Sequence, residues 1–82
     1  MRFYEYELRG CSTVKFWKNV VAAIAFATQD TIDYYRDEKG IDLEMFEWKA
    51  PEHASSVTVY FREKGKTDTY VCSYINIRET ED

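Results

Sequence analysis

The sequence has few of the residues from which motifs are usually built: two cysteines, one histidine, one proline and three glycines in 82 residues. Cys11 and Cys72 lie far apart, which excludes the disulfide framework of small secreted domains and favours reduced thiols. The glycines stand alone at positions 10, 40 and 65, so no glycine-rich loop can cradle a phosphate. The longest apolar run, residues 20–27, is far shorter than the about 20 residues that cross a bilayer. These absences favour a cytoplasmic protein without a membrane span, in the host cytoplasm if a phage encodes it.

Patterns for catalysis and metal binding are also missing. His53 follows Glu52 in a predicted loop, and a lone pair of this kind is more often solvated than catalytic. A metal site needs three or four ligands at suitable spacing, which Cys11, Cys72 and His53 do not provide. Nucleophilic catalysis needs a base and a group that orients it, and nothing in the sequence marks either. We therefore expect no enzyme, no metal site and no cofactor.

Negative charge is what the sequence has in excess. The net charge of −4 disfavours direct nucleic-acid binding, because such affinity comes from Lys and Arg that neutralise phosphates. Seven acids gather in residues 30–47, against two basic residues, Arg36 and Lys39. Such a run is usually a solvated surface. The alternative interpretation is a surface that meets a basic partner in place of phosphates.

Hydrophobic periodicity predicts a single domain over residues 1–82, with a frayed tail at 79–82. Alternating apolar residues predict strands that begin near positions 2, 41, 57 and 69. We expect a two-layer α+β fold in the order β-α-(α)-β-β-β, in which helix packs on one face of a mainly antiparallel four-stranded sheet. The first strand is expected at one edge of the sheet, or in parallel beside the second strand.

A helix is expected between the first two strands. Ser12 or Thr13 can serve as its N-cap, and Gly40 can end it in a left-handed conformation. A break at residues 28–30 is predicted, because one unbroken helix from 13 to 39 would be about 40 Å long and overhang the sheet. The apolar positions that recur at helical spacing and should face the sheet are Val14, Trp17, Val21 and Ile24.

Residues 20–27 are apolar on every side of this predicted helix. Ala22 and Phe26 fall on the side away from the predicted core stripe, and an apolar far side needs a second layer. Either the first strand and a second short helix cover it, or a second copy of the chain does. We prefer the second copy, which predicts a homodimer that associates through Ala22 and Phe26.

The outer face of the predicted sheet is rich in aromatic residues. Pairing Val59 with Val71 keeps the aliphatic residues on one face, which requires a longer turn or a bulge after Lys64. The outer face then carries Phe46, Trp48, Tyr60, Tyr70 and Tyr74. Cross-strand aromatic pairs stabilise a solvated sheet, whereas a contiguous aromatic patch marks an interface. The sequence leaves both interpretations open.

These features predict a small non-catalytic protein-binding module, an inhibitor or adaptor whose acidic and aromatic surface blocks a basic, nucleic-acid-handling partner. A phage protein directed against host defence is an example of this type. The predicted partner-binding residues are Asp33, Tyr34, Asp37, Asp42, Glu44, Phe46, Trp48, Tyr60, Tyr70 and Tyr74. One alternative is a sheet that binds single-stranded RNA or DNA by stacking its aromatic rings on bases. Another alternative is a homodimeric structural or regulatory subunit.

Overall fold

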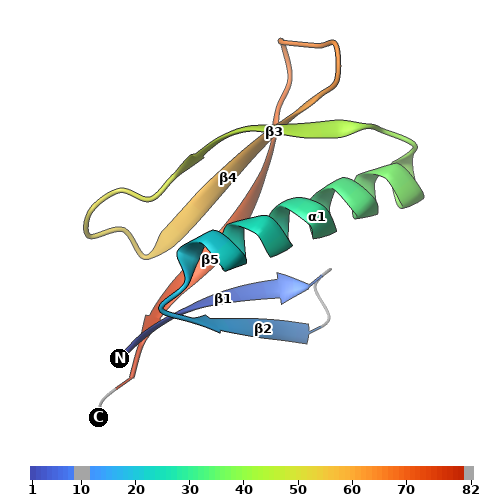
Figure 1. Cartoon of the computed structure of the whole chain (residues 1–82). Helices are drawn as coiled ribbons and strands as arrows, with labels where there is room; N and C mark the ends of the chain where they lie inside the picture. The colour runs from blue at the N-terminus through green and yellow to red at the C-terminus, as the bar shows by residue number, and fades with distance from the viewer. Residues whose placement is uncertain (9–11, 81–82) are drawn as a thin grey trace.

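One helix packs on a five-stranded antiparallel sheet in the computed structural model, which describes residues 1–8 and 12–80 (Figure 1). The strand order in the sheet is β2-β1-β5-β4-β3. The predicted α+β class is confirmed, but the sheet has five strands and not four. In chain order, the elements are β1 (Arg2–Leu8), β2 (Ser12–Trp17), α1 (Val20–Lys39), β3 (Leu43–Lys49), β4 (Ser56–Glu63) and β5 (Val71–Glu79).

The additional strand is β2, where the sequence predicts the start of a helix. It pairs with β1 from Leu8 opposite Ser12 to Phe3 opposite Trp17. Valine, threonine and aromatic side chains, which fill this segment, favour strands. The helical spacing of Val14 and Trp17 with the next segment was therefore misleading, and the N-cap predicted at Ser12 or Thr13 is wrong.

Helix α1 begins at Val20, after the end of β2, and Asn19 is its N-cap. The Asn19 side chain accepts a hydrogen bond of 3.0 Å from the backbone N–H of Ala22, which satisfies a free donor of the first turn. Gly40 ends the helix with a φ of 66°, as predicted, and its N–H donates to the Arg36 carbonyl. The helix is continuous, so the predicted break at residues 28–30 is wrong. With its start at Val20, the helix has 20 residues and is about 30 Å long, which removes the reason to expect a break.

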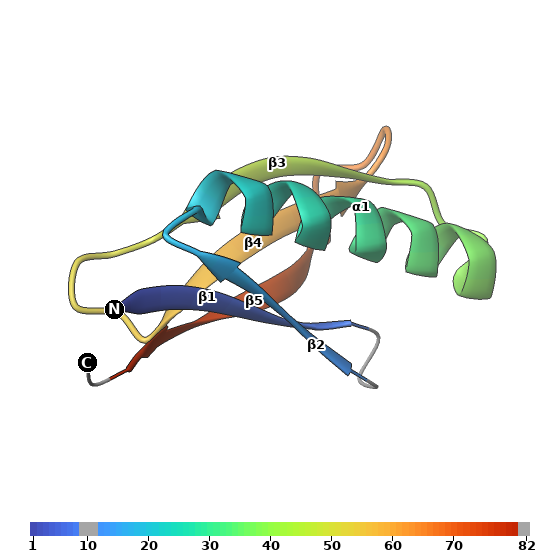
Figure 2. The same ribbon diagram turned by 60° about the horizontal axis from the view of Figure 1, so that its bottom comes forward.

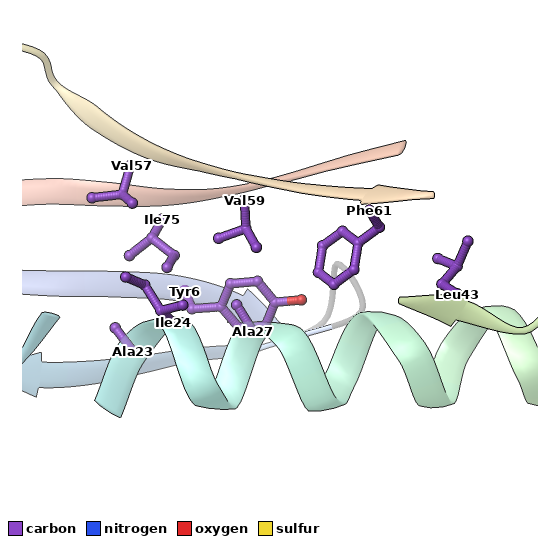
Figure 3. Packing of buried hydrophobic residues seen from close by; sticks show 9 residues of the cluster. All are labelled: Tyr6, Ala23, Ile24, Ala27, Leu43, Val57, Val59, Phe61 and Ile75. Atoms are coloured by element: carbon purple, nitrogen blue, oxygen red, sulfur yellow. The ribbon is translucent and has the colours of Figure 1, made fainter. Parts of the chain in front are cut away.

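The core lies between α1 and the sheet (Figure 3). The small side chains Ala23 and Ala27 are fully buried, and Thr31 continues this stripe along the helix. They let α1 approach the sheet closely, so part of the apolar run at residues 20–27 faces inward. The sheet residues without any exposed area are Val57, Val59, Phe61 and Ile75. In Figure 2, α1 lies over this face with β3 on one side and β1 and β2 on the other.

The first strand lies inside the sheet. β1 is antiparallel to both β2 and β5, so neither predicted position, at an edge or parallel to the second strand, is correct. The start of β1 and the end of β5 lie side by side (Figure 1), where Arg2 and Glu79 form an ion pair of 3.1 Å. The frayed tail was predicted from position 79, whereas Glu79 is the last residue of β5. Residues 81 and 82 lie outside the described part.

The register of β4 and β5 places the same residues on the inner face of the sheet as the sequence predicts. Val59 lies opposite Ser73 and Phe61 opposite Val71, so the aliphatic residues share one face. The pairing predicted for Val59 with Val71 is shifted by two residues, because the connection over residues 64–70 is longer than a three-residue turn. Tyr70 consequently lies just before β5.

Strand β3 contains a bulge between Met45 and Glu47. An extra residue in one strand reverses the alternation of all side chains that follow. Trp48 therefore lies opposite Val59, on the face that α1 covers. The prediction that Trp48 shares the outer face with Phe46 is wrong for this reason.

Candidate functional site

The sheet face opposite α1, the open face, carries most of the exposed aromatic rings. Strand alternation and pairing with β4 and β5 place Tyr60 and Tyr74 there. The Tyr60 ring centre is 6.1 Å from that of Phe46 and 6.1 Å from that of Tyr70, distances typical of interacting aromatic pairs. We name these four residues, Phe46, Tyr60, Tyr70 and Tyr74, the aromatic patch. Tyr70 is 67% and Tyr74 is 59% exposed, so the patch is open to a partner.

Neighbouring side chains raise the pKa of the Tyr74 phenol. The adjacent Cys72 thiol raises the pKa of Tyr74 above its ordinary value, and burial, Tyr60 and Tyr70 add to this effect. Cys72 is half-buried and is a free cysteine, while Cys11 lies outside the described residues. At neutral pH, Tyr74 therefore presents a neutral hydroxyl that can both donate and accept hydrogen bonds.

Cations cover two rings of the patch. The Arg62 guanidinium lies 3.9 Å from the Phe46 ring centre, and the Lys49 ammonium lies 5.5 Å from the Tyr60 ring centre. In the register of β3 and β4, Glu44 lies opposite Arg62 and Glu47 lies opposite Tyr60. Both acidic side chains therefore point to the open face. The patch thus combines exposed aromatic rings with charges of both signs.

A second aromatic pair lies toward the other edge of the open face. The Trp17 and Phe3 ring centres are 4.7 Å apart, and the Lys15 ammonium lies 5.3 Å from the Phe3 ring. Phe3 is buried beneath these side chains, while Trp17 is 50% exposed. Sequence reasoning missed this pair because it assigned Trp17 to a helix.

The predicted acidic residues do not form one surface with the patch. Asp33 and Asp37 lie on α1, and both form ion pairs with Arg36, at 2.9 and 3.3 Å. Asp42 lies between α1 and β3 and is exposed, and its carbonyl accepts a hydrogen bond from the Lys64 N–H. Glu44 alternates onto the opposite side of the sheet from α1. The acids of residues 30–47 are therefore divided between the two faces of the molecule.

Two further predicted residues, Tyr34 and Trp48, lie outside the patch. The Tyr34 ring packs edge-on against Tyr35 on α1, with ring centres 5.6 Å apart. Trp48 is 44% exposed at the edge of the α1-covered face. The structure therefore brings together Phe46, Tyr60, Tyr70 and Tyr74 and separates Tyr34 and Trp48 from them.

Phe26, one of the two residues predicted for self-association, lies against β1 and β2. The Phe26 ring centre is 5.6 Å from that of Phe16 and 6.0 Å from that of Tyr6. Phe26 is still 36% exposed, and Ala22 is half-buried. Strand β2, which the sequence did not predict, thus covers part of the apolar flank within the same chain.

A pocket of about 220 Å³ lies between α1, β1 and β5. Its lining is formed by Tyr6, Glu7, Asp30, Thr31, Tyr34, Tyr35 and Ser73. The Tyr6 hydroxyl donates a hydrogen bond of 2.7 Å to the Asp30 carboxylate, and Thr31 is hydrogen-bonded to Ser73 across the helix–sheet boundary. Burial raises the pKa of Tyr6 to about 12, so the phenol keeps its proton. No sequence motif marks this pocket, because its residues come from three distant segments.

The described residues offer little for metal or acid–base chemistry. His53 and Glu52 are 3.7 Å apart and both highly exposed. In residues 1–8 and 12–80, no three His, Cys, Asp or Glu side chains gather as metal ligands. Over the same ranges, no helix combines the length and hydrophobicity needed to cross a membrane. No protein-family model, curated protein or solved structure matches this chain.

Proposed function

We propose that this chain is a small non-catalytic protein-binding module, an inhibitor or adaptor, whose binding surface is the aromatic patch on the open face. The observation that carries the proposal is a cluster of exposed aromatic rings on a sheet face that no described element covers. Interface centres are enriched in Tyr, Trp, Phe and Arg, and such residues supply most of the binding energy. Arg62 stacked on Phe46 belongs to the same residue class.

The size of the open face agrees with this role. The described chain extends over 46 × 26 × 16 Å, and the sheet spans its broad side. A stable protein–protein interface needs about 800 Å² on each partner. A partner that covers the patch and reaches Trp17 would bury an area of this order.

Charge favours a protein over a nucleic acid on this face. Lys15, Lys49, Arg62 and Arg78 alternate onto the open face, but so do Glu5, Glu7, Glu44 and Glu47. Arg78 also lies 3.4 Å from Glu5 and is partly neutralised by it. Single-stranded nucleic acids need a positive groove beside the stacking rings, and this face has no net positive charge.

A second candidate function is imitation of nucleic-acid phosphates by α1, which would block a basic partner of the kind a phage inhibitor targets. Asp30, Asp33 and Asp37 recur every three or four residues and therefore share one flank of the helix. Arg36 weakens this candidate, because it pairs with both Asp33 and Asp37. We therefore place the partner on the aromatic patch first.

The experiment compares three baits for affinity capture from the native host, quantified by mass spectrometry. The baits are the parent chain, the double variant Tyr70→Ser/Tyr74→Ser, and the control Val21→Ser, which changes a 70% exposed residue of α1. We expect one partner with the parent and the control, and at least a tenfold loss of its affinity, measured with purified proteins, for the double variant. Equal binding of the purified partner to all three baits contradicts the proposal.

The alternatives have their own readouts in the same samples. Sedimentation of the parent as a dimer that dissociates in Tyr70→Ser/Tyr74→Ser would assign the patch to self-association. Quenching of tryptophan fluorescence by single-stranded RNA, lost in Tyr60→Ala, would assign it to base stacking. Either result would replace a separate protein partner as the function of the patch.

A further inference from the structure

Strands β1 and β5 pair over only part of their length. Their ladder runs from Arg2 opposite Glu79 to Glu5 opposite Asn76. Beyond that point β5 pairs with β4 alone among the described strands, and Figure 1 shows β1 and β5 diverging from the end where Arg2 lies opposite Glu79. Helix α1 crosses the angle between them. The 220 Å³ pocket occupies this angle, with Tyr6 on β1, Ser73 on β5 and Asp30 on α1 in its lining.

The lining of this pocket selects a positive charge. Asp30 supplies a carboxylate to it, and no basic side chain is among the described residues that form the lining. Glu7 also lines the pocket, but its side chain alternates onto the open face. The remaining polar groups are phenols and hydroxyls, and the Tyr6 phenol already donates its proton to Asp30. An anion would meet the Asp30 carboxylate and be repelled, whereas a cation would be attracted in a site that is partly shielded from water.

The tyrosine rings favour a planar cation. Tyr34 and Tyr35 both line the pocket, and their rings stand at 77° to each other. The Lys39 ammonium lies 5.7 Å from the Tyr35 ring centre, so this ring is placed within reach of a cation in the folded chain. A guanidinium group can stack on an aromatic ring while its N–H donors reach a carboxylate, which a compact ammonium group cannot do.

The volume restricts the size of the occupant. Pockets for drug-sized ligands and cofactors measure about 300–1,000 Å³, so a pocket of about 220 Å³ fits a single side chain. We propose that the pocket between α1, β1 and β5 binds the guanidinium group of an arginine from a partner protein. This inference rests on the proposed function, since it names a residue that a protein partner would present.

The experiment uses a small probe, so it does not depend on the identity of the partner. N-acetyl-arginine methylamide is titrated into the isotope-labelled full chain, and amide NMR signals are followed. We expect binding with a Kd on the order of 1 mM and the largest shifts in residues 30–35 and at Ser73. N-acetyl-citrulline methylamide has nearly the same shape without the charge, and its affinity should be at least about tenfold lower. Equal shifts with both probes, or shifts confined to other regions, would overturn the proposal.

Three variants separate the pocket from general electrostatic attraction. Asp30→Asn should weaken arginine binding about tenfold and still offer an oxygen to the Tyr6 hydroxyl. Tyr34→Leu removes a lining ring from a half-buried position of α1, should also weaken binding, and keeps the test valid if Asp30→Asn does not fold. Glu38→Gln removes the same charge from an exposed position of α1 outside the lining and should leave the affinity within about twofold. An equal loss in Glu38→Gln and Asp30→Asn would show nonspecific attraction.

Failure of this inference is distinguishable from failure of the proposed function. If the probe does not bind but the partner still depends on Tyr70 and Tyr74, the pocket is not part of the interface and the module stands. If the probe binds as described but no partner depends on the aromatic patch, the guanidinium site stands and the patch proposal falls.

Discussion

Tyr6 and Asp30 join β1 to α1 through a hydrogen bond of 2.7 Å between the phenol and the carboxylate. Tyr6 is only 6% exposed, so this bond lies at the inner end of the pocket and at the margin of the hydrophobic core. The same hydroxyl lies 3.5 Å from Thr31, which in turn contacts Ser73 on β5. A short polar chain thus links three elements at the point where β1 and β5 diverge.

Removal of the Tyr6 hydroxyl should destabilise the fold measurably. Tyr6→Phe keeps the ring in the core but leaves Asp30 and Thr31 without this partner. A hydrogen bond to a charged group contributes about 1.5–3 kcal/mol, and the partial exposure of Asp30 reduces this value, so we expect a loss of about 1–2 kcal/mol in the free energy of unfolding. Urea unfolding followed by circular dichroism measures it. Unchanged stability would mean that water replaces the phenol at no cost.

Alkaline pH should weaken the same contact. Burial raises the pKa of Tyr6 from 10 to about 12, so in that interval the unfolded chain has released the proton that the folded chain still holds. The stabilisation is fully present below pH 10 and is lost as the pH rises through 12. The free energy of unfolding should therefore fall with pH more steeply in the parent than in Tyr6→Phe. Parallel curves for the two proteins would contradict this, because the two proteins differ only in the Tyr6 hydroxyl.

The start of α1 can be tested by two cap variants. Asn19→Ala removes the side chain that accepts from the Ala22 N–H and should cost about 1 kcal/mol of stability. Thr13→Ala is the matched control, because Thr13 is an exposed strand residue opposite Glu7 and caps nothing. It should change stability by at most about 0.5 kcal/mol. A larger loss for Thr13→Ala than for Asn19→Ala would favour the earlier helix start that the sequence suggested.

The sequence predicts the features that depend on local periodicity. Val57, Val59 and Phe61 alternate, and this period of two correctly indicates β4 and its core face. Gly40 ends α1 as expected, because glycine tolerates the left-handed conformation at little cost. These signals lie within a few residues of the features they predict.

The features that the sequence did not predict depend on distant partners. Val14 and Trp17 fit a helical spacing as well as a strand, and only β1 as a neighbour decides between the two. The bulge in β3 follows from its pairing with β4, and it moves Trp48 to the other face. The pocket arises where β1 and β5 diverge, although Tyr6 and Ser73 are far apart in the chain. None of these has a local signal.

Substitution of Phe26 should lower the stability of the fold, whether or not it changes the oligomeric state. Its ring packs against Phe16 and Tyr6, so Phe26→Ala removes contacts between α1 and the β1–β2 hairpin. We expect a loss of about 1–2 kcal/mol, less than for a fully buried phenylalanine. Val21→Ala, at a position 70% exposed, is the control and should be nearly neutral. If Phe26→Ala keeps its stability but changes a parent dimer to a monomer in sedimentation, self-association through this flank is correct.

Once a partner is available, substitutions of the acidic residues and substitutions in the aromatic patch should change its affinity by different amounts. In the triple variant Asp33→Lys/Asp37→Lys/Asp42→Lys, six units of charge change, but the aromatic rings of the patch remain. If the patch carries the binding, this variant should lower the affinity less than about threefold at physiological ionic strength, with a larger effect only at low salt. Tyr70→Ser/Tyr74→Ser should lower it at least tenfold at both ionic strengths, because apolar contact is not screened by ions. The opposite ranking of the two variants would assign recognition to the acidic flank of α1, and the partner would then be expected to lose binding when its own basic residues are neutralised.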